Sequence, residues 1–465
     1  MTEAASTVEA PAEIAGPNRR WITLPIISWA MYDFANTIFS LSVLSISFNS
    51  WIVTERHGHD WYLFVMQAFV TVALIASMPL LGAVADRRGV RKPMLVAFTL
   101  ASVACTFGLG LVNSTIAGLM LAGIAIFCFQ SALSHYDPLL AAVAPDERIR
   151  GKVSGLGVGL GYIGALAGFV VLAMVVGSES TTILHHAGHI IRIHHYVHNQ
   201  HAFLPTAIMF LVFSLPCFLF VRNPGRPAAA VAESIPAIMR GAATQLGATM
   251  RNISGHREIV RFLIGRFLYA DSLSVIITFM AIYLDRLGGF NHDNRKSMVI
   301  ASAMVSAALA AFVAGRLVDR IGPRKVLVSV VMLVAFGMVV EAITGSATLI
   351  WVFGPLIGAG LGSVWTSDRV FMMRISPPIA RGEFFGIYNL VGKVSSAVGQ
   401  GIWVATGFAV SGAFGWNELL QNRASIAVLA IVMTVGAWLV WGVSDAERDW
   451  SDDQLERALE ATVAP

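Results

Sequence analysis

The sequence predicts an all-α membrane protein whose transmembrane helices form two pseudo-symmetric six-helix bundles. The first observation behind this prediction is composition: 56% of the 465 residues are hydrophobic and 13% are charged, about half the charged share of an average soluble protein. The second is duplication. A short basic turn at 82–92 returns at 315–325, with six identical residues at a constant offset of 233. This repeat is too long for a solenoid unit and indicates two copies of one membrane half.

Twelve segments of the chain are long and apolar enough to be membrane helices, which need about 20 mostly apolar residues. They cover 24–50, 61–85, 93–112, 115–144, 154–177, 202–221, 259–284, 296–318, 325–344, 347–374, 384–410 and 423–443. We therefore expect a disordered N-terminus (1–21), a first bundle (22–221), a central loop (222–257), a second bundle (258–443) and a C-terminal tail (444–465).

Lysine and arginine gather on one side of these predicted spans. The two basic turns, the central loop and the segments around Arg148 and from Arg369 to Arg381 fall on this side, whereas the opposite loops contain few basic residues. Cytoplasmic loops are enriched in Lys and Arg, so both termini are expected in the cytoplasm. The short loops favour a bacterial inner membrane.

A second set of repeated residues extends the duplication. Asp137, Arg150, Gly151, Gly155 and Gly161 each recur 231 positions later, so predicted helices four and five match helices ten and eleven. Two six-helix halves of parallel topology are typical of secondary transporters.

These motifs resemble those of known families. Segment 82–92 resembles the signature loop between helices two and three of the major facilitator superfamily, and 315–325 resembles its echo in the second half. Segments 29–36 (Trp-Ala-Met-Tyr-Asp-Phe-Ala-Asn) and 382–393 (Gly-Glu-Phe-Phe-Gly-Ile-Tyr-Asn-Leu-Val-Gly-Lys) are similar to signatures of the autophagy-related vacuolar effluxer family and its bacterial relatives. The resemblance implies a permease, with amino acid efflux as the first candidate activity.

Charged residues within the spans are candidates for the transport site, because intramembrane ionisable groups usually face a cavity or a partner. Asp33 and Asp271 are candidate acids for binding protons or a cationic group; the alternative is a buried structural acid, hydrogen-bonded by Asn36 or a neighbouring tyrosine. Lys393 is a candidate partner for either acid or for a substrate carboxylate; the alternative is a lysine that reaches the membrane edge. Tyrosines and amides expected to line the same cavity are Tyr32, Asn36, Tyr136, Tyr269, Tyr388 and Asn389.

Six further charged residues lie near the predicted cytoplasmic ends of the spans. They are expected to form ion pairs that close the inner side in one state and break in the other, or else permanent structural bridges. These gate candidates are Asp86, Arg91, Asp137, Asp319, Arg324 and Asp368.

A histidine-rich loop between the fifth and sixth predicted spans is a weak metal-site candidate. His185 with His189, and His194 with His198, have i,i+4 spacing, which places two imidazoles on one face only in a helix. No cysteine accompanies them, so a polar surface segment is the favoured interpretation.

We therefore expect a monomeric secondary transporter for a small polar solute, working by alternating access and coupled to protons through Asp33, with Asp271 as a second candidate. No cofactor or nucleic-acid partner is expected, and the spans contain no nucleophile–base set that would indicate an enzyme. A uniporter without ion coupling and a non-transporting ligand sensor remain alternatives.

Overall fold

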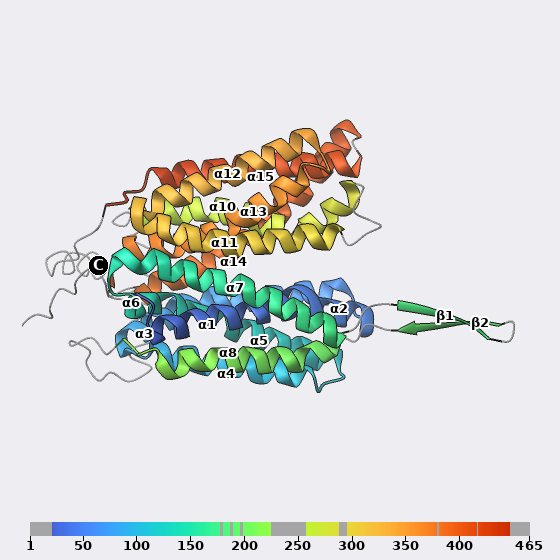
Figure 1. Ribbon diagram of the computed structural model, residues 1–465, viewed down its shortest axis with the longest axis horizontal. Helices are drawn as coiled ribbons and strands as arrows, with labels where there is room; N and C mark the ends of the chain where they lie inside the picture. The colour runs from blue at the N-terminus through green and yellow to red at the C-terminus, as the bar shows by residue number, and fades with distance from the viewer. Residues whose placement is uncertain are drawn as a thin grey trace, which may run out of the picture.

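The computed structural model describes residues 21–176, 180–186, 189–195, 199–224, 257–287, 295–378, 381–415 and 417–446, and these are nearly all helical (Figure 1). The first half contains the long helices α1 (Leu24–Phe39), α3 (Asp60–Arg88), α4 (Arg91–Leu109), α5 (Thr115–Tyr136), α7 (Glu147–Val176) and α8 (Phe203–Phe220). The second half contains α10 (Arg257–Leu287), α11 (Arg295–Ile321), α12 (Pro323–Thr344), α13 (Ile350–Ile375), α14 (Arg381–Phe414) and α15 (Glu418–Trp441).

Short elements extend some of these helices. The first helix continues beyond α1 through the π-helix η1 (Ser40–Ile46), α2 (Ser47–Ser50) and a second π-helix, η2 (Trp51–Glu55). After α5 the chain tightens into the 3₁₀ turn η3 (Asp137–Leu139) and the short α6 (Leu140–Val143), and η4 (Asn199–Ala202) precedes α8. Pro138 explains the end of α5, because proline has no N–H to continue the helical hydrogen bonds.

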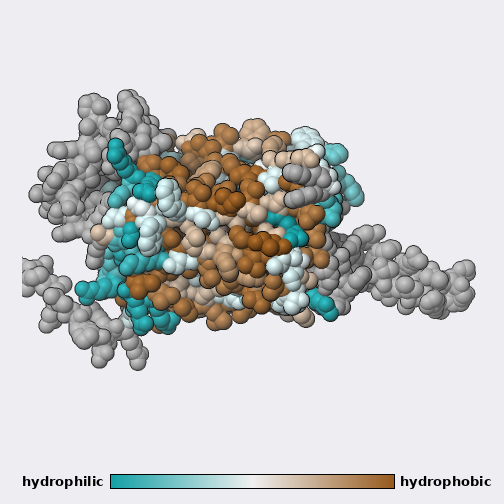
Figure 2. Space-filling view, turned by 90° about the horizontal axis from the view of Figure 1, so that it is seen from above, coloured by the Kyte–Doolittle hydropathy of each residue, from teal (hydrophilic) through white to brown (hydrophobic). Residues whose placement is uncertain are grey.

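The helices form a protein that spans a membrane many times. Each of the twelve predicted segments coincides with a helix, and ten of these helices are long and apolar enough to cross a bilayer; α10 and α14 are the two outside that group. Large apolar side chains lie on the outer surface, such as Phe69 at 74% and Phe408 at 76% exposure. Figure 2 shows them as a broad hydrophobic band, with hydrophilic residues gathered toward the ends.

The two ends of the helical bundle differ. At one end, here called the turn end, α1 begins, α15 ends, and the two basic turns join α3 to α4 and α11 to α12 (Figure 1). Gly89 and Gly322 in these turns have φ angles of +63° and +93°, a region that favours glycine. At the opposite end, here called the hairpin end, β1 (Ser180–His186) and β2 (His189–His195) form an antiparallel hairpin.

The two halves pack together through α7 on α11 and α3 on α14, mainly near the turn end. Figure 1 shows α7 and α11 close together there and drawing apart toward the hairpin end. Glycines permit the contact: a Cβ added to Gly155 of α7 would lie 2.4 Å from the Ala311 carbonyl oxygen, and one added to Gly82 of α3 would lie 2.2 Å from the Gly382 oxygen. Small residues of this kind let membrane helices approach closely.

The histidine-rich segment is not helical where the structure describes it. His185 lies in β1, whereas His189 and His194 lie in β2, so the helical spacing that would bring His185 and His189 together does not apply. His198 lies outside the described residues, as do 1–20, 225–256 and 447–465, for which a disordered terminus, most of a central loop and most of a tail are predicted. The searched part of the chain contains no group of three or more residues suited to hold a metal ion.

Candidate transport site

An arginine of the second half is shared by two carboxylates of the first half. In α13, Arg369 places Nη1 3.1 Å from Asp33 Oδ2 and Nε 3.0 Å from Asp137 Oδ1. The arginine side chain is 11% exposed, and the two aspartates are 8% and 9% exposed. These three residues, here called the shared-arginine cluster, join α1, η3 and α13 across the boundary between the halves.

Aromatic rings of the first half support the arginine. Trp29 and Tyr136 stack with ring centroids 4.7 Å apart, and the guanidinium carbon of Arg369 lies 5.2 Å and 5.5 Å from their centroids. A cation over an aromatic face is attracted by the ring quadrupole. The Tyr136 hydroxyl donates to the Trp29 carbonyl oxygen at 3.0 Å, which holds the two rings together.

Two asparagines complete the contacts of the aspartates. Asn36 donates to Asp33 Oδ1 at 3.0 Å within α1. From the second half, Asn389 of α14 donates to Asp137 Oδ2 at 3.2 Å. Gly157 of α7 packs against the same place, since a Cβ there would lie 2.4 Å from Asp33 Oδ2. The aspartates are therefore enclosed by α1, α7 and α14.

The charge count gives this cluster its chemistry. One guanidinium neutralises one of the two carboxylates, so the cluster carries a net negative charge when both are ionised. A charge within a membrane span is costly, roughly 2.5–3.5 kcal/mol on insertion scales. A proton on either carboxylate removes the excess charge and also weakens that carboxylate's attraction to Arg369.

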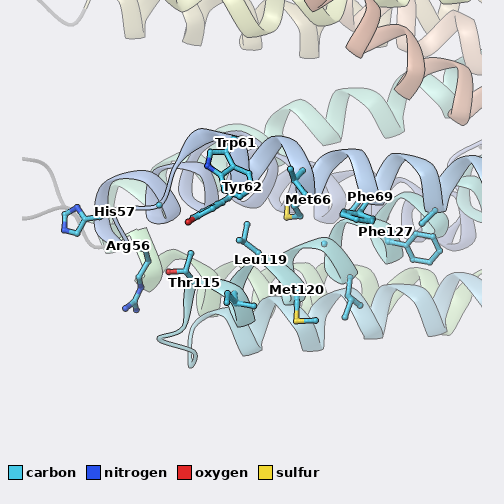
Figure 3. A pocket seen from close by; sticks show the side chains of 17 residues that line it. Arg56, His57, Trp61, Tyr62, Met66, Phe69, Thr115, Leu119, Met120 and Phe127 are labelled. Carbon is cyan, nitrogen blue, oxygen red and sulfur yellow. The ribbon is translucent and has the colours of Figure 1, made fainter.

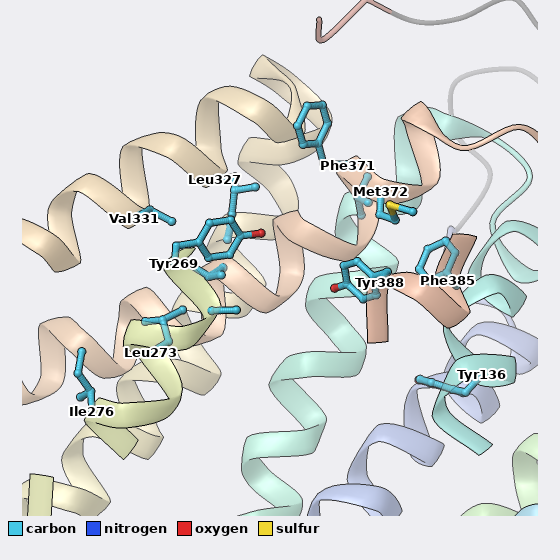
Figure 4. Packing of buried hydrophobic residues seen from close by; sticks show 14 of the residues in the cluster. Tyr136, Tyr269, Leu273, Ile276, Leu327, Val331, Phe371, Met372, Phe385 and Tyr388 are labelled. Atoms are coloured by element: carbon cyan, nitrogen blue, oxygen red, sulfur yellow. The ribbon is translucent and has the colours of Figure 1, made fainter. Parts of the chain in front are cut away.

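A second buried arginine–aspartate pair lies entirely within the second half. Arg266 of α10 donates from Nε to Asp368 Oδ2 at 3.0 Å, and the hydroxyls of Tyr269 and Tyr388 donate to the same carboxylate at 2.7 Å and 3.0 Å. The guanidinium carbon of Arg266 also lies 3.6 Å from the centroid of the Tyr388 ring. Figure 4 shows Tyr269 and Tyr388 on neighbouring helices of this half. Arg266 and Asp368 balance each other in charge.

Neither Asp271 nor Lys393 is among the ion-pair and hydrogen-bond partners described above for the shared-arginine cluster. Asp271 is 1% exposed and packs on Gly399 of α14, where a Cβ would approach its Oδ1 to 1.9 Å. Lys393 is partly exposed and follows Asn389 by four residues, so both lie on the helical face that Asn389 turns toward the first half. Lys393 is one candidate partner for Asp33 in the sequence analysis, and the structure pairs Asp33 with Arg369.

At the turn end, two aspartates of the basic turns bind the start of a helix in the opposite half. Asp86 accepts from the backbone N–H groups of Gly382 and Glu383 at 2.6 Å and 3.3 Å and also pairs with Arg91. Asp319 accepts from the N–H groups of Gly151 and Lys152 at 2.7 Å and 3.0 Å. Gly382 and Glu383 lie in the first turn of α14, where free N–H groups and the helix dipole stabilise an anion, whereas Gly151 and Lys152 are the fifth and sixth residues of α7. The duplicated sequence thus forms two equivalent latches.

Three predicted residues take other positions. Arg324, expected at the gate, donates to the carbonyl oxygens of Trp441 and Val443 at 3.2 Å and 2.8 Å, so it fastens the end of α15 within its own half. Asp368, also expected at the gate, joins only groups of the second half in the contacts above. Tyr32, expected in the cavity, makes a 2.7 Å hydrogen bond with Thr99 of α4 inside the first half.

The sequence interpretation missed Arg369 and Arg266, although signals for both exist. Arg369 was counted among the cytoplasmic loop charges, yet it lies inside the predicted span 347–374. Arg266 lies inside the span 259–284 and exactly one repeat offset of 233 beyond Asp33. An acid in the first half therefore corresponds to a base in the second.

Comparison with known proteins identifies the family of this chain. Residues 52–452 match the family described as vacuole effluxer Atg22 like. The chain belongs to this family. A similar relative is the MFS-type transporter YxiO of Bacillus subtilis, 26% identical over 87% of this chain and 91% of YxiO.

Solved structures show the same major facilitator fold. The human organic anion transporter MFSD10 (TETRAN) aligns over 92% of this chain and all of its own, with a TM-score of 0.65 and 14% identity. The proton:xylose symporter XylE aligns over 91% of this chain and 95% of its own, with a TM-score of 0.62 and 15% identity. The Atg22-like chain is therefore a multi-pass membrane transporter, and not an enzyme.

Proposed function

We propose that this transporter moves a small solute carrying a carboxylate, such as an amino acid, in exchange or symport with protons. The observation that carries the proposal is the single Arg369 guanidinium shared by Asp33 and Asp137 across the two halves. The proposed orientation places the turn end in the cytoplasm, because the basic turns and both ends of the described chain lie there.

The described contacts correspond to a state that is closed at the turn end. The Asp86 and Asp319 latches and the Asn389–Asp137 hydrogen bond all cross between the halves on this side. In the proposed cycle, one half rocks against the other, as in transporters with repeated halves. Opening the turn end separates the latches and the shared-arginine cluster together.

Proton binding would favour this opening. When both aspartates are ionised, each attracts Arg369 and holds α1 and η3 against α13. When one is protonated, the charge–charge attraction to the guanidinium is lost, and a hydrogen bond from the guanidinium to a neutral carboxyl group remains, which is weaker than the ion pair. The proton therefore changes the free energy of the closed state, and a solute that binds one state better is coupled to it.

Lys393 is the proposed contact for the solute carboxylate. Its ammonium group lies on the face of α14 that Asn389 turns toward the first half, and the side chain is partly exposed. Two structural neighbours support the proposal, since MFSD10 is an organic anion transporter and XylE is a proton:xylose symporter.

A transport assay tests both the amino acid substrate and the coupling to protons. Protein in proteoliposomes is supplied with a radiolabelled mixture of the common amino acids, with and without a pH gradient. We expect the wild type to accumulate label only with the gradient. Asp33→Asn and Asp137→Asn should lose gradient-driven accumulation but retain exchange of label for unlabelled amino acids.

Several outcomes would contradict the proposal. Gradient-driven accumulation that survives in both variants would remove the cluster from coupling, and wild-type transport insensitive to the gradient would favour a uniporter. Ligand binding without any flux would favour a sensor. Absence of both binding and flux with this mixture would reject the amino acid class.

A further inference from the structure

An apolar groove lies between α3 and α5, away from the shared-arginine cluster. Its volume is about 880 Å³, within the range of roughly 300–1,000 Å³ that holds small ligands. Figure 3 shows α3 lying between this groove and the second half. The lining is mainly aliphatic, aromatic and methionine side chains, including Val65, Met66, Phe69, Leu119, Met120 and Phe127. We call it the lateral groove.

The lateral groove opens toward the hydrocarbon of the bilayer. Both α3 and α5 are helices that can cross a membrane, and the groove occupies their hairpin-end halves. Its rim is exposed: Phe69 at 74%, Ile116 at 71% and Met120 at 66%. The polar residues Gln67 and Thr71 of α3 are two positions from Phe69 and therefore point to nearly the opposite side of the helix.

Small residues create the space. Gly123 of α5 faces α3, and a Cβ there would meet Met66 Cγ at 3.5 Å and Val70 Cγ2 at 3.6 Å. These are ordinary contact distances, so a methyl group fits, whereas a longer side chain would fill the groove. A side chain can therefore be added at this position without displacing the backbone.

The mouth of the lateral groove is polar and basic. Arg56 and His57 lie there, followed by Trp61 and Tyr62 at the start of α3. The Arg56 guanidinium is held in place by hydrogen bonds to Asn113 at 2.8 Å and Gln200 at 3.1 Å. Trp and Tyr are enriched where a bilayer meets water, so this level corresponds to the lipid headgroups.

We propose that the lateral groove binds an acyl chain of an anionic membrane phospholipid, with the headgroup phosphate beside Arg56. The apolar lining and its opening toward hydrocarbon suit an acyl chain, and the basic mouth complements a negative headgroup. A small polar solute suits this site poorly, because the interior offers few polar groups. The site would anchor a lipid on the first half.

Photolabelling tests the site in the full-length protein. The protein is placed in nanodiscs containing phosphatidylglycerol with a diazirine on one acyl chain, and labelled peptides are mapped by mass spectrometry. We expect labelling to concentrate on 61–73 and 115–127. Gly123→Leu should remove most of it, whereas Gly412→Leu, at a glycine with no atom within 4 Å of an added Cβ, should leave it unchanged.

The headgroup is tested with Arg56→Gln and with phosphatidylcholine carrying the same diazirine. We expect the preference for phosphatidylglycerol over phosphatidylcholine to fall about tenfold in this variant, the size expected for losing a charge-assisted hydrogen bond. Thermal melting and size-exclusion profiles identify variants that fail to fold.

The result that overturns the proposal is uniform labelling of all membrane-facing helices, or labelling unaffected by Gly123→Leu in a folded protein. Equal labelling by the two lipids would overturn the role of Arg56. Displacement of the label by the amino acid mixture would assign the groove to a transported solute instead. The photolabelling experiments do not measure transport. A negative result would therefore reject the lipid site without rejecting the proposed transport function.

Discussion

Replacing Gly82 with alanine should shift the transporter away from the state closed at the turn end. The added Cβ would lie 2.2 Å from the Gly382 carbonyl oxygen and 3.0 Å from the Glu383 nitrogen. Ordinary contacts of a Cβ begin near 3.4 Å. The distance to the Gly382 oxygen would therefore have to grow from 2.2 Å to 3.4 Å, so α3 and α14 would separate by about 1.2 Å. The atoms in the way are backbone atoms of the opposite half, which no side-chain rotation can move.

The size of the shift follows from the cost of overpacking. Forcing extra atoms into a packed interface costs about 1–3 kcal/mol. Here the cost applies only while α3 and α14 are in contact, so it acts on the closed state alone. A difference of this size changes the ratio of the two states by a factor of about 5 to 150.

Spin-label distance measurements can detect the shift. Labels are placed on Arg148→Cys in α7 and Arg320→Cys in α11, two exposed turn-end positions, after replacing the native cysteines Cys105, Cys128 and Cys217. We expect Gly82→Ala to increase the population of longer distances. Gly401→Ala is the matched control, since a Cβ there meets no atom within 4 Å. Identical distance distributions in Gly82→Ala and the control would refute the reasoning.

Three further substitutions probe other contacts. Arg369→Gln leaves two carboxylates without their cation and should destabilise the fold by about 3–5 kcal/mol, seen as a lower melting temperature in detergent. The control is Arg316→Gln, since Arg316 is exposed and donates to the Phe312 carbonyl oxygen of its own helix. An equal loss of stability in the control would contradict the prediction. Tyr388→Phe removes one donor from a buried carboxylate and should cost about 1–3 kcal/mol; an unchanged denaturation midpoint would count against it. Asp319→Asn weakens one latch, so the distances between the same spin labels should lengthen, and an unaltered distribution would show that the latch does not hold the closed state.

Much of the architecture could be predicted because its signals are spread along the chain. A membrane helix requires a long apolar stretch, and a duplication repeats many residues at one offset, so errors at single positions matter little. The hairpin escaped prediction for a local reason. Its segments contain threonine and isoleucine beside histidine, and β-branched residues favour strands, but the histidine spacing was interpreted on a helix.

The site was only partly predictable, because a sequence indicates how deep a residue lies in the membrane more readily than which way its side chain points. Asp33 is predicted as an acid of the transport cavity from its position within a span, and Asp137 as a gate acid near the cytoplasmic end of a span. Arg369 was assigned to the membrane surface, since counting basic residues near helix ends does not reveal which way a side chain points. Tyr32 lies near the expected depth but faces α4, and that direction depends on how the helices pack.

The unequal placement of charge between the halves bears on how the protein is assembled. A chain is synthesised from its N-terminus, and its early domains generally fold first. Asp33 and Asp137 therefore reach the bilayer well before the ribosome has made Arg369, whereas Arg266 and Asp368 arise within the same half. Asp33 and Asp137 can pair with Arg369 only after α13 has been synthesised and inserted, so their pairing is a late step of biogenesis.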